Sequence, residues 1–92
     1  MRLQATRMTT ETAAALVEAG LASIRGGDLG VDLSDVTEVD SAGVAMLVAW
    51  LREATARGGT LVLTHIPPAL ASLARLYGVD GLLGIAHHPA PA

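Results

Sequence analysis

The stretch VDLSDVTEVDSAGVAMLVAWL, Val31–Leu51, decides the fold of this chain. It starts in an apolar strand, crosses a loop rich in acids and enters a helix at Ser41. Apolar residues then recur at the helical spacing i, i+3, i+4 and i+7, at Val44, Leu47, Val48 and Leu51. Gly58-Gly59 ends the pattern. The stretch therefore predicts a strand, a polar loop and a helix over about 41–57.

Similar units lie on both sides of this stretch. Weak alternation predicts a short edge strand at 3–7, and helical spacing with a Gly26-Gly27 stop predicts a helix at 11–25. The short segment 29–33 reads as a strand. A β-branched strand at 60–66 leads to Pro67-Pro68, which suits a helix start, with Leu70, Leu73, Leu76 and Tyr77 on its apolar face. This order predicts one α/β domain with a parallel sheet at residues 1–86, and a disordered tail at 87–92.

Composition excludes several classes of function. The net charge is -3, all six basic residues are Arg, and there is no Lys. Nucleic-acid binding needs clustered cations, and Walker A loops and Schiff-base enzymes need a lysine. The composition therefore disfavours all three classes of protein. Apolar runs are too short for a membrane span, and no signal peptide is recognisable. We therefore expect a cytoplasmic protein without direct membrane insertion.

The predicted second helix carries two apolar faces. Val44, Leu47, Val48 and Leu51 share one arc, whereas Met46 and Trp50 fall on the opposite side. An exposed Met and Trp one turn apart would suit a partner-binding anchor, because Trp is enriched at binding hot spots and Met adapts its shape. The alternative is that another helix covers this side and makes it ordinary core.

Two readings also remain open for Ser41. Its hydroxyl could be the N-cap of the helix, with Asp40 complementing the positive end of the helix dipole. It could also be an exposed hydroxyl at the carboxyl edge of a parallel sheet, where such folds place their sites, and be phosphorylated. The neighbouring acids show no calcium-loop spacing, and the histidines have no recognisable catalytic partner. We expect no catalytic, cofactor-binding or metal-binding residue.

The segments DLS (Asp32–Ser34) and DSAG (Asp40–Gly43) resemble the motifs of the STAS domain, named for sulphate transporters and anti-sigma factor antagonists. The likeness extends through LASLARLYGVDGLL to about residue 84, and LARLYGV looks most like the MlaB-type STAS subunit of the bacterial Mla phospholipid-transport ABC system. It implies a small, mostly parallel sheet with helices on one side. STAS domains usually open with two strands, so the first edge strand here is either missing or supplied differently.

The resemblance also implies a non-catalytic function with no cofactor. An Mla-like subunit binds and supports the cytoplasmic ATPase of the transporter, and so lies peripheral to the inner membrane through its partner. In the anti-sigma factor antagonist branch, the serine that corresponds to Ser41 is phosphorylated by an anti-sigma factor kinase. Both branches point to one surface, with Asp40, Ser41, Ala42 and Gly43 as a docking corner beside Met46 and Trp50. The sequence does not specify the oligomeric state.

Overall fold

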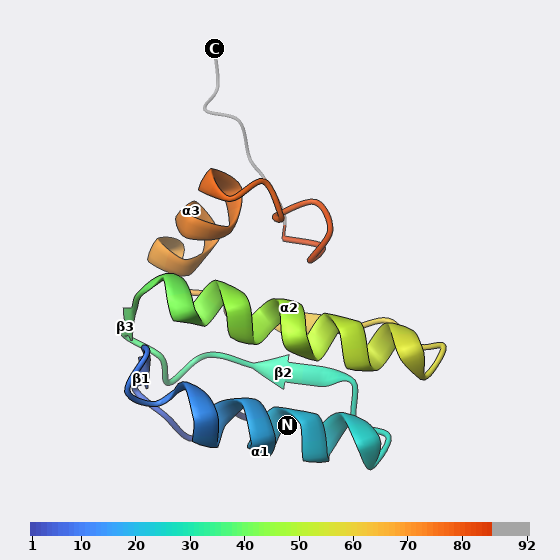
Figure 1. Ribbon diagram of the computed structural model, residues 1–92. Coiled ribbons are helices and arrows are strands. Elements are labelled where there is room, and N and C mark those ends of the chain that lie inside the picture. Colours follow the sequence, from blue (N-terminus) through green and yellow to red (C-terminus); the bar gives the residue numbers. More distant parts are fainter. Residues whose placement is uncertain (86–92) are drawn as a thin grey trace.

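A computed structural model describes residues 1–85 as alternating strands and helices (Figure 1). In chain order the elements are β1 (Arg7–Met8), α1 (Ala13–Arg25), β2 (Gly30–Asp32), β3 (Glu38–Val39), α2 (Ser41–Ala56), β4 (Val62–Thr64) and α3 (Pro68–Leu76). The α/β class predicted from the sequence is confirmed. The acidic loop differs from the prediction, because it contains the short strand β3. The predicted tail at 87–92 lies outside the described residues.

All strand pairs are parallel. β2 pairs with β4, β1 pairs with β3, and Arg2 forms an additional bridge to Asp32. The Leu3 amide donates to the Asp32 carbonyl (2.9 Å) and the Thr37 amide to the Thr6 carbonyl (2.8 Å). Residues 1–8 therefore run beside residues 30–39 as one edge strand, and β4 forms the other edge. Among the described residues, one strand precedes α1, whereas the family resemblance implied two.

The sheet is covered on one face. Leu3, Val31 and Leu61 are buried, whereas their neighbours Gln4 and Val62 are exposed, which is the period-two pattern of a one-sided layer. The expected packing of helices on one side is thus confirmed. The alternation shifts after Ala5, because the chain bends at Thr6, and Met8 instead of Arg7 turns into the core.

Helix α2 is the centre of the helical layer, because it packs against both α1 and α3. Its buried residues therefore cover more than one side of the helix: Gly43, Val44, Met46, Leu47, Trp50 and Ala54. The prediction that Met46 and Trp50 project outward is wrong, since they are 1% and 0% exposed. Val48 and Leu51, which the sequence placed in the core, are only half-buried. Helical spacing marks apolar positions but does not reveal which neighbours cover them.

The indole of Trp50 forms the contact between α1 and α2. Its Nε1 donates a hydrogen bond to the Val17 carbonyl of α1 (3.2 Å), and its ring lies over Gly20. A Cβ atom at position 20 would overlap Trp50 Nε1 and Cε2, so glycine is required there. Near the carboxyl end of both helices, Arg25 Nε donates to Glu53 Oε1 (2.6 Å). Gly20 therefore makes room for Trp50, the largest fully buried side chain of the core.

Helix α3 buries less of its apolar residues than the sequence suggested. Leu70 and Ala74 are fully buried, but Leu76 and Tyr77 are 76% and 56% exposed. Figure 1 shows α3 lying over the amino-terminal part of α2, with its last turn pointing away from that helix. The prediction that Leu76 and Tyr77 belong to the packed face is therefore wrong.

Candidate functional site

The predicted docking corner, Asp40–Gly43, directly follows β3 at the carboxyl end of the parallel strands. In Figure 1 the arrow of β2 points toward this end, where β3, the first turn of α2 and the start of α3 lie together. Loops at the carboxyl edge of parallel strands are where α/β folds place their sites. The acidic loop, the amino-terminal end of α2 and the loop from β4 to α3 form this candidate site.

The four acids between Asp32 and Asp40 each have a separate partner. The pairs are Asp32 with His65 Nδ1 (3.1 Å), Asp35 with Arg2 (2.6 Å), Glu38 with Arg7, and Asp40 with the Ala42 amide (2.8 Å). Within residues 1–85, no three His, Cys, Asp or Glu side chains converge as a metal site would require. Asp35 and Glu38 pair with Arg2 and Arg7 of the edge strand. These two ion pairs hold the edge strand against the loop.

Asp40, and not Ser41, is the N-cap of α2. Asp40 has extended backbone angles, and its carboxylate accepts hydrogen bonds from the Ala42 amide (2.8 Å) and the Thr10 amide (3.2 Å). The reading of Ser41 as the cap is therefore wrong. Ser41 is the first residue of the helix and is exposed. Because the cap is supplied by its neighbour, the Ser41 side chain is not required for the helix start.

Gly43 is buried inside the fold. A Cβ atom at this position would lie 3.1 Å from Leu70 Cδ1 and 3.4 Å from the Met8 carbonyl oxygen. The glycine lets the first turn of α2 approach β1 and α3 closely. The expectation that Gly43 is an accessible part of the docking corner is wrong, and its role is internal packing. Ala42 is half-buried, so Asp40, Ser41 and Ala42 remain at the surface.

The solvent side of α2 begins at Ser41. We call this surface the α2 stripe, and it consists of Ser41, Ala45, Val48, Ala49 and Arg52. Ser41, Ala45 and Arg52 are exposed and the other two are half-buried. Small side chains over the first turns allow another backbone to approach closely. The sequence contained the signal for this surface, because Ala45 and Ala49 are small residues one turn apart.

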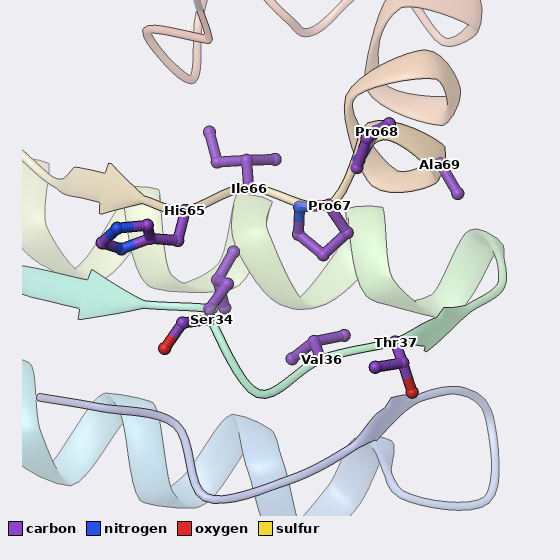
Figure 2. Close-up of a pocket in the computed structure, with 9 residues that line it drawn as sticks. Ser34, Val36, Thr37, His65, Ile66, Pro67, Pro68 and Ala69 are labelled. Atoms are coloured by element: carbon purple, nitrogen blue, oxygen red, sulfur yellow. The ribbon is translucent and has the colours of Figure 1, made fainter.

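An open cleft of about 520 Å³ lies beside the start of α3. Figure 2 shows its two walls, with Ser34, Val36 and Thr37 on one segment and His65, Ile66 and Pro67 on the other. Most of the lining is apolar, and the polar members Ser34, Thr37 and His65 are exposed. No sequence motif predicted this cleft, although the Pro67-Pro68 pair after a strand indicates a rigid loop there.

His65, which lines this cleft, has an unusual backbone conformation. Its φ is 54°, in the left-handed region, and its ring nitrogen Nδ1 lies 3.1 Å from Asp32 Oδ1. The Ser34 amide hydrogen bond and the nearby His65 lower the pKa of Asp32, against the opposing effect of partial burial. The Asp32 carboxylate thus connects the two segments that line the cleft, through the Ser34 amide (2.9 Å) and His65 Nδ1 (3.1 Å).

A family model described as Mlab, STAS domain matches residues 3–84. No curated protein and no solved structure matches significantly. In the part of the chain that the structure describes, no helix combines the length and apolar character needed to cross a bilayer. The matched range runs from the edge strand to the turn after α3 and includes both quoted motifs. The chain therefore belongs to the STAS domain family and is most similar to its MlaB type.

Proposed function

We propose that this chain is a non-catalytic STAS adaptor that binds and supports the cytoplasmic ATPase of an Mla-like phospholipid transporter. Membership of the MlaB-type family over residues 3–84 is the observation that carries the proposal. The protein lies in the cytoplasm and is peripheral to the inner membrane through this partner. It needs no cofactor, because its contribution is contact and not chemistry.

The docking surface in this proposal is the corner Asp40–Ala42 continued by the α2 stripe. Ser41 and Ala45 are exposed and uncharged, and the charged residues of this surface are Asp40, whose carboxylate already accepts from two backbone amides, and Arg52. An approaching helix or loop therefore meets little unpaired charge near the corner. Met46 and Trp50 do not serve as anchors, because both are enclosed by the fold. Trp50 instead holds α2 against α1, because its Nε1 donates to the Val17 carbonyl.

Such an adaptor acts through differential contact with the states of its partner. A bound subunit shifts an equilibrium between ATPase conformations only by the difference in its affinity for them. A rigid surface is suited to this task, and α2 is rigid here because α1, α3 and the sheet all pack against it. The adaptor then favours the ATPase conformation whose surface fits the α2 stripe.

The test is a matched pair of surface substitutions. Ala45→Arg places a long cation in the α2 stripe, and Ala19→Arg places the same side chain on an exposed position of α1. We expect Ala45→Arg to abolish co-purification with the Mla-like ATPase of the same host, while Ala19→Arg retains it. Both variants should keep the far-UV circular dichroism spectrum of the wild type. Equal co-purification of both variants would contradict the placement of the docking surface.

The second candidate function is an anti-sigma factor antagonist controlled by phosphorylation of Ser41. The exposure of Ser41, together with a cap that Asp40 supplies, favours this reading because the hydroxyl is accessible. A phosphate there would sit beside Asp40 and change the charge of the docking corner. Incubation with host lysate and ATP, followed by mass spectrometry, separates the two functions. Stoichiometric phosphate on Ser41 supports the switch, and its absence supports the adaptor.

A further inference from the structure

The edge strand at residues 1–8 has backbone groups that face away from the sheet. The Leu3 amide donates to the Asp32 carbonyl, and the Met1 carbonyl accepts from the Asp32 amide. In a parallel pair of this pattern the intervening residue, Arg2, turns its own N–H and C=O to the opposite side. Strand alternation gives Gln4 the same direction. Within residues 1–85, the amide and carbonyl of Arg2 and Gln4 have no backbone hydrogen-bond partner.

We propose that this edge pairs with the same edge of a second copy of the chain. An unprotected edge is a template for another strand, and proteins usually blunt it with proline, a bulge or a free charge. Residues 1–8 contain no proline. The charge of Arg2 is directed across its own sheet to Asp35, whose Oδ1 lies 2.6 Å from the guanidinium. The edge between Arg2 and Gln4 is therefore open to pairing.

The geometry favours a second copy because the edge is complementary to itself. An antiparallel arrangement with its two-fold axis at Leu3 places Arg2 opposite Gln4 of the partner, and Gln4 opposite the partner's Arg2. Each pair exchanges both backbone hydrogen bonds. On the open face of the sheet a guanidinium then neighbours an amide, and no like charges lie opposite each other. Leu3 stays in its own core, where it is 1% exposed.

The contact is small, so the association is weak and reversible. Stable interfaces bury about 1,200–2,000 Å² in total, and a few residues of strand edge bury much less than that. The axis at Leu3 lies toward the amino-terminal end of the edge strand, whereas the docking corner lies at the carboxyl end of the sheet. Dimerisation therefore leaves the α2 stripe accessible and stands independently of the proposed function.

Substitution of Gln4 tests the proposal. Gln4→Pro removes an outward amide that has no partner in the fold, and proline is tolerated on an edge strand at such a position. Gln4→Ala removes the same side chain but keeps the amide. Sedimentation equilibrium between about 10 µM and 1 mM covers the range of such weak contacts. We expect the mass of the wild type and Gln4→Ala to rise toward twice the monomer mass, while Gln4→Pro remains a monomer with an unchanged circular dichroism spectrum.

A second measurement uses the wild type alone. We expect hydrogen exchange of the Gln4 amide, followed by nuclear magnetic resonance, to slow as the protein concentration rises. A wild type that stays monomeric at the highest concentration overturns the proposal, and so does Gln4 exchange that is independent of concentration. Dimerisation of Gln4→Pro to the same extent as the wild type also overturns it, because the contact then lies elsewhere.

Discussion

The two sides of α2 carry different side chains and have opposite roles. One side presents Met46 and Trp50 to the rest of the fold, and the other presents Ser41 and Ala45 to solvent. From the sequence, the side with the tryptophan looked like the partner-binding surface. The difference lies in α1, where Gly20 leaves room for an indole ring. A large apolar residue thus indicates contact, but only the opposing element shows whether that contact is internal.

The largest effect should come from removing the indole. Trp50→Ala is expected to destabilise the protein by about 3–5 kcal/mol, because it leaves a cavity between α1 and α2. Arg52→Ala, on the solvent side of the same helix, should change stability by less than about 0.5 kcal/mol. Urea denaturation measures both. Near-wild-type stability of Trp50→Ala would show that the indole is not part of the core.

The second-largest effect is expected at Gly20 of α1, which contacts the Trp50 indole. Gly20→Ala should destabilise by about 1–3 kcal/mol, since the new methyl group collides with the Trp50 ring. An ordinary helical Gly→Ala change would instead stabilise by roughly 0.5–1 kcal/mol. In a Trp50→Leu background we expect the sign to reverse, because the obstacle is gone. A stabilising Gly20→Ala in the wild-type background would refute the contact.

The docking corner should respond less strongly. Asp40→Ala removes the acceptors of the Ala42 and Thr10 amides, and an N-cap loss costs about 1 kcal/mol. Asp40→Asn retains a capping oxygen and should recover most of this stability. Thermal melts of the two variants supply the comparison. Equal melting temperatures for Asp40→Ala and the wild type would show that the cap does not stabilise α2.

The ion pair between the carboxyl ends of α1 and α2 should give a smaller, pH-dependent effect. The hydrogen bond from Arg25 is the main cause that holds the pKa of Glu53 below its ordinary value of 4.5. Its contribution to stability is therefore present above that value and is lost as the pH falls through the folded-state pKa. Glu53→Gln should be less stable than the wild type at neutral pH, and the difference should shrink as the pH falls through the lowered folded-state pKa of Glu53. A stability difference that does not shrink in acid would exclude the ion pair as its source.

The smallest effect is expected at Ser41. Ser41→Ala should leave the free energy of unfolding within about 0.5 kcal/mol of the wild type, because the side chain is exposed and Asp40 supplies the cap. Loss of partner binding by this variant with unchanged stability would separate function from folding on the same helix. A large loss of stability would instead make Ser41 a structural residue.

Local sequence patterns predicted the features that depend on a single helix or strand. Helical spacing with glycine stops located α1 and α2, and Pro67-Pro68 located the start of α3. They were insufficient where two elements meet. The exposure of Leu76 and the burial of Met46 depend on where α3 and α1 cross α2, and no helical period contains that information. The same limit applies to the candidate site, because the cleft is formed by loops that are far apart in the sequence.

The sequence by itself determined the α/β order, the parallel strands and the STAS motifs, because these follow from local periodicity, turn residues and short motifs. Tertiary structure alone decided that Trp50 is core, that Asp40 caps α2 and that Gly43 is buried. Among the described residues, it also left the backbone groups of Arg2 and Gln4 without a backbone partner. The physical reason is that burial and hydrogen-bond pairing belong to contacts between elements, which a single helix or strand pattern does not encode.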